Sequence, residues 1–586
     1  MLKTISVLFS QFLATIGFAS SRELLCFLSE SDNAVVSVIS QGESHPQILY
    51  SDDNKKTWKE LSSGGKITFK GTGEKIYLKG DNPQGFSVGE KDYTKFVIEG
   101  KISASGNIMS LVYGKGSSKK IPNDYCFYQL FAYCQGLVSA PELPSKGLTK
   151  RCYSNMFCGC SQLKEAPQLP AKKMEEGCYR GMFEACKGIE KAPELPAKKL
   201  MDKCYSNMFR DCKGLISAPA LPAKKLYDYC YSSLFAGCSA LTNAPELPAT
   251  ELAKGCYNSM FEKCVALSHA PELPATTLKE KCYWGMFLSC AQLTEMPKLP
   301  ATVMERECYA WMFANCRSLE RSQQLPATRM SELCYESMFC NCASLAEAPK
   351  LPASEMKAHC YEKMFKGCLK LKETPDLQAD KLAKACYRSM FSGCEGLTEA
   401  KPLPAVTLAD ECYAEMFKNC SQLKQAPQLP ATQLAKSCYA WMFANCGQLK
   451  QAPQLPATTL ADNCYNLMFL LCVNLEKAPE LPATSLADNC YAGMFSKCEK
   501  LEEAPALPAQ ELAERCYNGM FSECGKLKKV SVGFKRWAGY TLTWLNDVAE
   551  QGLFVCPESL PEEYGENRIP EGWNVKKEFV ISRPQE

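Results

Sequence analysis

Cysteine is the residue of this chain with the most chemical potential, because 32 of its 36 cysteines recur in pairs at a fixed spacing. Each pair follows the pattern C-Y-x-x-M-F-x-x-C or a close variant, in sixteen copies from Cys126 to Cys524. The second cysteine comes eight residues after the first, and successive pairs begin 26 residues apart. Cysteines at such a spacing could form disulfides, hold a metal ion or act as nucleophiles.

The spacing argues against the first two of these chemistries. Two cysteines eight residues apart in a helix lie ~12 Å from each other, so one repeat cannot close its own disulfide. Equivalent cysteines of neighbouring repeats would lie ~5–10 Å apart, which leaves scattered disulfides between repeats as an alternative. Zinc needs four converging ligands, yet the chain has no C-x-x-C pair, and its close pairs are Cys158–Cys160 and Cys340–Cys342. Both repeat cysteines fall among apolar residues, so we expect unpaired, buried packing cysteines and no metal site.

Catalytic chemistry finds no support in the sequence either. None of the three histidines, His45, His269 and His359, can be placed beside a repeat cysteine and an Asn or Asp, and we expect His269 and His359 on the surface. The chain has no P-loop, G-x-G-x-x-G, G-x-S-x-G or H-E-x-x-H motif. Carboxylates follow the repeat and form no singular pair that would mark an acid/base site. We therefore expect no enzyme, no catalytic residue and no cofactor.

One helix per repeat is the first element expected to position these residues. From Leu408 to Cys420, apolar residues fall at offsets 0, 4, 5, 8, 9 and 12, which trace one stripe of a helix with 3.6 residues per turn. Thr407 is the candidate N-cap, and Pro404 prevents the helix from starting earlier. The pattern predicts an amphipathic helix of about thirteen residues in each repeat.

A short strand is the second expected element. After Cys420 the sequence L-x-x-A-P-x-L-P is too short and too rich in proline for a helix. Proline occupies the Pro427 position in 13 of 15 linking segments, and the exceptions are Gln323 and Lys401. Proline cannot donate to a sheet ladder, so we expect about three hydrogen-bonded residues, from Leu423 to Gln425. A strand and a helix in every 26 residues predict an α/β fold, a right-handed leucine-rich-repeat solenoid with a parallel sheet.

The period also sets the expected domains. Residues 114–529 are expected to form the solenoid of sixteen repeats, and residues 21–113, with short alternating runs between Gly, Asp and Asn turns, a small all-β domain. Its final strands could cap the first repeat. Residues 1–20 carry Lys3, an apolar stretch and a small-x-small site, which predict a secretory signal peptide; a first strand is the alternative. Residues 530–586 are expected to cap the other end.

The C-terminal cap has three expected elements. The segment 527–532 imitates the repeat strand without its prolines, and 552–556 is expected to form a last strand. Between them, 541–551 is expected to form one more helix, with Leu542, Leu545 and Val548 on one side.

Two polar columns vary between repeats and are the candidate ligand face. One lies two residues before the repeat proline, and the other lies directly after it. A solvated sheet face is the alternative to a ligand face, which solenoids commonly carry. The candidate residues are Glu165, Gln168, Lys191, Glu194, Glu246, Glu272, Glu295, Lys298, Lys350, Gln425, Gln428, Gln451 and Glu480. On the opposite side, Trp284, Trp311 and Trp441 are either contact aromatics or packing residues.

Charge and hydropathy argue against nucleic-acid binding and against a transmembrane helix. The net charge is +3, with 67 basic and 64 acidic residues, which is not the balance of a nucleic-acid-binding chain. Beyond residue 20, no stretch approaches the ~20 apolar residues of a transmembrane helix. The sequence gives no indication of the oligomeric state.

The repeat resembles the bacterial BspA-like leucine-rich-repeat surface proteins, especially those of gut Bacteroidales. The shared core is M-F-x-x-C-x-x-L, as in Met416 to Leu423, and the flanks Tyr93–Val112 and Ile569–Trp573 are also similar. The resemblance covers roughly residues 90–575. It implies surface display and adhesion to host or microbial surface and matrix proteins, or to glycans. The chain departs in its 26-residue period, its prolines and the lack of a visible C-terminal anchor.

Two functions remain open from the sequence. The first is a secreted or cell-surface binding protein that uses the concave face of the solenoid. The second is a structural spacer that holds the N-terminal β domain away from the cell, with no ligand of its own. If the protein is secreted, so many free thiols imply a reducing or oxygen-poor setting.

Overall fold

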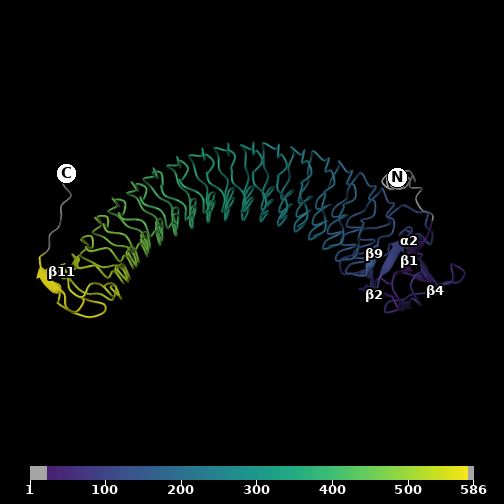
Figure 1. Cartoon of the computed structure of the whole chain (residues 1–586), viewed down its shortest axis with the longest axis horizontal. Helices are drawn as coiled ribbons and strands as arrows, with labels where there is room; N and C mark the ends of the chain where they lie inside the picture. Colours follow the sequence, from purple (N-terminus) through teal and green to yellow (C-terminus); the bar gives the residue numbers. More distant parts are fainter. Residues whose placement is uncertain (1–22, 579–586) are drawn as a thin grey trace, which may run out of the picture. The chain divides into compact units, whose positions relative to one another are not determined.

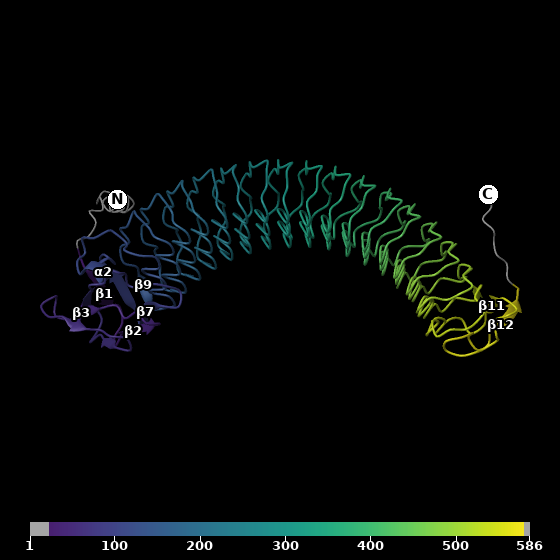
Figure 2. The same cartoon turned by 180° about the vertical axis from the view of Figure 1, so that it is seen from behind.

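A computed structural model describes residues 23–578 of the 586-residue chain. The signal peptide predicted at residues 1–20 lies outside the described residues. The chain divides into two compact units, Met1–Pro248 and Ala249–Glu586, and each is described by itself. Within each unit the repeats form turns that lie side by side (Figure 1), and the view from behind shows the same stacking (Figure 2).

The first unit begins with β-strands that form two sheets. One sheet has the order β4-β3-β6-β1-β8-β9, and the other has the order β5-β2-β7. The strands are antiparallel, apart from the parallel pair β8 and β9. The elements are β1 (Leu25–Ser29), β2 (Val35–Gln41), β3 (Leu49–Ser51), β4 (Lys59–Glu60), β5 (Lys66–Thr68), β6 (Lys75–Lys79), β7 (Tyr93–Glu99), β8 (Ile102–Ser105), the short helix α2 (Ser110–Tyr113) and β9 (Leu137–Ser139).

The sheets cover the core of the first repeat. The ring of Phe96 on β7 lies 5.4 Å from Phe27 on β1 and 5.4 Å from Phe131 in the first repeat. Strand β8 pairs in parallel with β9, with Ile102 opposite Leu137. The apolar end of the stack is therefore closed by the strand domain, as repeat proteins require of their terminal units.

The predicted helix of each repeat is wrong. Within residues 23–578, the one helix is the four-residue α2, and residues 410–419 form consecutive tight turns. Successive amides alternate between two kinds of acceptor. The Met416 amide donates to Tyr413 O within its own turn, at 3.2 Å, and the Phe417 amide donates to Met442 O of the next turn, at 2.9 Å. Every second amide thus joins neighbouring repeats, whereas a helix would satisfy all of them internally.

Left-handed residues at every fourth position make these turns possible. In the segment described above, φ is 56° at Glu411, 57° at Glu415 and 62° at Asn419. The same three positions have positive φ in all sixteen repeats, and none of them holds a β-branched residue. Positive φ at the third residue is what a type II turn needs. The apolar spacing of four residues is therefore the period of the turns, which a short helix of period 3.6 imitates.

The predicted strand is in place but shorter than expected. At the position of Gln425, single residues of neighbouring turns pair in parallel, as in Lys191 with Ser217 and Glu295 with Arg321. A second line of parallel pairs runs through Thr407, which pairs with Gln433 and is not a helix N-cap. The proline two residues after the first line has no amide hydrogen to donate, which limits the ladder on that side in the turns that carry it.

Stacked side chains of the same type form the core of each unit. The rings of Tyr179 and Tyr205 lie 5.9 Å apart and nearly parallel, and those of Phe183 and Phe209 lie 5.6 Å apart. The repeat Met, Cys and Leu positions are buried alongside them. Stacked aromatic pairs stabilise by about 0.5–1.5 kcal/mol beyond their buried area. Each turn therefore depends on its neighbours for its core.

The C-terminal end of the second unit is a three-stranded parallel sheet of β10 (Lys529–Ser531), β11 (Leu553–Cys556) and β12 (Asn574–Lys577). The two strands expected at 527–532 and 552–556 are present as β10 and β11. The helix expected at 541–551 is wrong, because positive φ at Thr543 and Asp547 continues the pattern of turns. Leu542 is 51% exposed, whereas Trp544 is buried with its ring 6.3 Å from Tyr517. Trp544 thus closes the aromatic stack.

Candidate functional site

The two polar columns lie on either side of the repeat proline, outside the buried core. The first column occupies the bridged position two residues after the buried repeat leucine, and the second follows the repeat proline directly. Parallel backbone pairing between turns sets the position of the first column. The position of the second column is set by the buried leucine that directly follows each of its residues. All thirteen candidate residues of the predicted ligand face are exposed.

The structure does not bring these thirteen residues into one site. In the first unit, Glu165 and Lys191 occupy the same position in neighbouring turns, and so do Gln168 and Glu194. Glu246 lies two turns beyond Glu194. The other eight residues belong to the second unit and are spread from Glu272 to Glu480. They form short polar ladders rather than a single cluster.

A groove interrupts the columns in the second unit. Its volume is about 620 Å³, and residues of three successive turns line it. Its lining residues are Glu320, Arg321, Ser322, Gln323, Gln324, Ser344, Ala346, Glu347, Ala348, Pro349, Lys350 and Lys370. Lys350 is the member of the predicted ligand face that lines it. The groove carries side chains of both charges and two amides, which suit a peptide segment rather than a single ion.

The groove forms where the repeat departs from its own pattern. Gln323 stands in place of the usual proline, and the exposed Gln324 follows it. The Ser322 hydroxyl donates to Glu347 O in the next turn at 3.1 Å. The Ala346 amide reaches Glu320 O only at 3.5 Å, against 3.1 Å for the Glu320 amide to Thr294 O on the other side. The Ser322 and Ala346 bonds join the turn of Gln323 to the next turn along the groove.

The groove residues other than Lys350 were not part of the predicted ligand face. The sequence signal for them is Gln323 itself, because 13 of the 15 linking segments have proline at this position and this segment does not. The second exception, Lys401, is half-buried and lies 3.4 Å from Asp376 in an ion pair. A missing proline thus identifies an altered turn, but not whether that turn opens.

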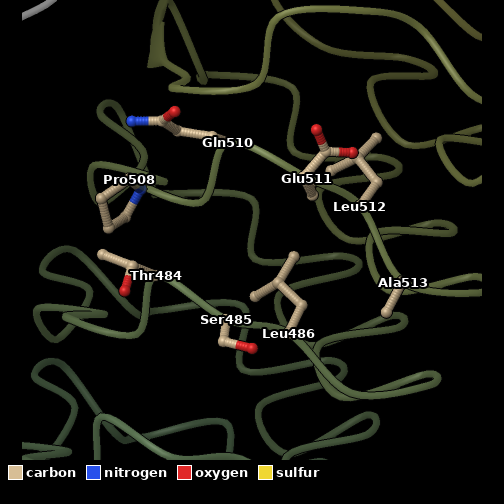
Figure 3. Close-up of a pocket in the computed structure, with 8 residues that line it drawn as sticks. All are labelled: Thr484, Ser485, Leu486, Pro508, Gln510, Glu511, Leu512 and Ala513. Atoms are coloured by element: carbon tan, nitrogen blue, oxygen red, sulfur yellow. The ribbon is translucent and has the colours of Figure 1, made fainter.

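A second hollow lies on the other line of parallel pairs and has a volume of about 400 Å³. Figure 3 shows Thr484, Ser485 and Leu486 on one turn, opposite Pro508 and the segment 510–513 on the next. Its one carboxylate, Glu511, pairs with Arg536 at 2.8 Å, and both side chains are 77% exposed. The hollow contains neither histidine nor cysteine, so its Ser485 and Thr484 hydroxyls have no histidine beside them to act as a general base.

The cysteines are packing residues with an additional hydrogen-bonding role. All 36 fall within residues 26–556 and are buried, and none of them forms a disulfide in the described structure. The second cysteine of a repeat donates its thiol to the phenylalanine carbonyl of the preceding turn, as Cys420 Sγ does to Phe391 O at 3.2 Å. Burial raises the pKa of Cys152 and Cys394 to about 12. These thiols stay protonated at neutral pH, which excludes a thiolate nucleophile among them.

The histidines and tryptophans take part in local contacts. The His269 ring lies 2.8 Å from Ser268 Oγ, and His359 Nδ1 lies 2.6 Å from Glu362 Oε2 in the same turn. His269 is exposed, as expected, whereas His359, also expected on the surface, is half-buried; His45 is exposed. The three tryptophans named above are half-buried, and Lys418 lies 4.2 Å above the ring of Trp441.

The described part of the chain, residues 23–578, contains no group of three or more His, Cys, Asp or Glu residues placed to hold a metal ion. It also contains no helix with the length and apolar content to cross a lipid bilayer.

Comparison with known proteins identifies the repeat. The family model described as "BspA type Leucine rich repeat region (6 copies)" matches residues 202–346, 257–398, 336–476 and 411–536, which together span more than half of the chain. No curated protein matches the sequence. Among solved structures, "Crystal structure of TLR13-ssRNA13 complex" is 12% identical, with a TM-score of 0.23, and the match covers 75% of this chain. The match covers about half of that chain, 49% of its length.

Proposed function

Because the chain belongs to the BspA-type leucine-rich-repeat family, whose members have protein-interaction or surface roles, we propose that it is a non-enzymatic, secreted or cell-surface adhesion protein. The partners are host or microbial surface or matrix proteins, held on the exposed polar columns. The observation that carries this proposal is the groove at Gln323. It is the place where the variable columns widen into a hollow large enough for a ligand.

The size and lining of the groove support a peptide ligand. A volume of about 620 Å³ falls within the range of ligand sites, ~300–1,000 Å³. Arg321 and Lys350 can pair with carboxylates, and Glu347 with a basic side chain. The Gln323 and Gln324 amides can each donate and accept hydrogen bonds, which an extended peptide backbone needs. The invariant core contributes no such discrimination, since it is the same in every turn.

The test begins with capture of partners by the full chain from host matrix proteins and bacterial surface material. The variant Gln323→Pro restores the regular turn, which 13 other segments show the fold accepts. Combined with Arg321→Ala and Lys350→Ala, it should weaken binding of the captured partner about tenfold or more. The control is Lys450→Ala with Lys477→Ala, which removes two exposed cations at least three turns away from the groove.

Equal binding by the groove variant and the control would contradict a role for the groove. No capture above that of an unrelated solenoid would contradict adhesion itself and favour a structural spacer. Secretion is tested separately, by sequencing the N-terminus of the mature protein, which should begin after the predicted signal at residues 1–20.

A further inference from the structure

A column of lysines in the first unit is a second exposed surface, separate from the groove and from both polar columns. It occupies the two positions that follow the P-A or P-S dipeptide of the repeat, in four successive turns. We call it the lysine ladder; its members are Lys146, Lys172, Lys173, Lys198, Lys199, Lys224 and Lys225. All seven are exposed.

Backbone pairing holds the lysine ladder in register. Lys173 and Lys199 form a parallel bridge, and the Met174 amide donates to Lys199 O at 3.2 Å. Residues paired in this way lie ~4.8 Å apart between turns. Four turns therefore present two rows of ammonium groups along a line of ~15 Å.

The fold does not require lysine at these positions. The same two positions in the other eleven turns hold mainly Thr, Ser, Glu, Val and Gln, and their only cations are Arg329 and Lys381. Thr276 and Thr277, for example, occupy them together in the second unit. Seven lysines in four turns are thus a property of this surface rather than of the repeat.

Among the described residues, no ion pair neutralises Lys172, Lys173, Lys198 or Lys199, whereas opposite charges pair elsewhere in the stack. At the same position in the second unit, Glu355 and Lys381 form a parallel bridge and lie 3.5 Å apart as an ion pair. Like charges directly opposite each other on paired strands are destabilising. Two nearby acids have other partners: Glu176 pairs with Lys150 at 2.8 Å, and Asp202 Oδ1 accepts the Asp228 amide at 3.0 Å.

We propose that the lysine ladder binds a linear, sulfated anionic polysaccharide that lies along the stack of turns. A polyanion with charges repeated along its length would relieve the repulsion between turns and release counterions. The alternative polyanion is a nucleic acid, which the surface fits less well. Single strands bind through aromatic side chains that stack on bases, and the eight residues at these two positions of the four turns are seven lysines and one glycine. Lysine also supplies a point charge without the bidentate geometry that arginine offers to phosphate.

The experiment measures binding of the full chain to a heparin fragment as a function of salt. The variant replaces Lys172, Lys173, Lys198 and Lys199 with threonine, which the fold already carries at both positions. The control variant replaces Lys101, Lys115, Lys187 and Lys213, four exposed lysines of the same unit, and changes the net charge equally. We expect the ladder variant to bind heparin about tenfold or more weakly, with a shallower dependence on salt, and the control to bind like the wild type.

Three results would overturn the proposal: no binding of heparin by the wild type at low salt, equal weakening in both variants, or equally tight binding of single-stranded DNA. Desulfated heparin and hyaluronan separate sulfate from carboxylate recognition, and undiminished binding to either would also overturn the sulfated ligand. The groove variant should bind heparin normally, so this surface and the proposed adhesion groove can fail independently.

Discussion

At the residue scale, the repeat cysteines are candidates for chemistry in the sequence, and in the structure they act as buried hydrogen-bond donors between turns. The sequence predicts buried, unpaired thiols, because both positions fall among apolar residues. It does not predict why cysteine, rather than another small apolar residue, follows each phenylalanine by three positions. The structure supplies a reason: the thiol of Cys420 donates to Phe391 O, a bond between turns that alanine could not make.

The buried thiols predict a specific dependence of stability on pH. Burial raises the pKa of Cys204 and Cys316 to about 12, against ~8.5 in an unfolded chain. Both states keep the proton below pH ~8.5; above it the unfolded state releases protons first, so the free energy of unfolding falls. The loss is about 1.4 kcal/mol per pH unit for each such thiol.

Thermal unfolding under reducing conditions checks this dependence. The Tm should be nearly constant from pH 6 to 8 and fall steeply between pH 8.5 and 9.5. Replacing Cys386 and Cys394 of one turn by alanine should make the fall shallower. A Tm that stays constant up to pH 9.5 would show that the folded-state thiols ionise as easily as unfolded ones.

At the element scale, the sequence predicts the period, the buried positions and the parallel pairing near Gln425, because these depend only on burial and on proline. It does not predict the turns. A spacing of four fits the stripe of a short helix, and the distinguishing signal lies at the exposed positions. Glu411, Glu415 and Asn419 stand where no repeat places Val, Ile or Thr, a preference expected for left-handed residues and not for a helix surface.

The substitution Gly393→Ala distinguishes turns from a helix, because the change in the free energy of unfolding has opposite signs in the two structures. Gly393 has φ of 73°, and a Cβ there would meet no atom closer than 3.8 Å, so the cost is conformational. In the left-handed turn, alanine should destabilise by about 1 kcal/mol, whereas in a helix it would stabilise by about as much.

Chemical unfolding of Gly393→Ala gives the answer, with two matched variants. Gly393→Asn should lose less stability, because asparagine tolerates the left-handed region. Gly447→Ala, at a glycine without positive φ and with 4.0 Å to its nearest neighbour, should be neutral or slightly stabilising. An increase in stability for Gly393→Ala would refute the turns.

At the scale of the whole molecule, the same bonds explain how one chain can combine a uniform scaffold with distinct surfaces. Within each unit, regular turns pair through amides whose acceptors lie 25 residues further along the chain, as Phe417 does with Met442. These backbone bonds depend on the repeat period and not on the identity of the exposed residues. The groove at Gln323 and the lysine ladder are local changes on that scaffold. The regular repeat positions therefore determine the fold, and the positions that depart from the repeat form the two surfaces that we propose to bind partners.

The most direct test of this account compares two deletions of one full period, each of which leaves the remaining turns in phase. Deleting residues 309–334 removes the turn that carries Gln323, and deleting 413–438 removes a regular turn. Both variants should fold, with similar Tm, since stability is a sum over neighbouring turns. We predict that the first deletion abolishes binding of the captured surface partner and that the second leaves the affinity unchanged. Equal binding by both variants would show that no particular turn recognises the partner and would contradict the account.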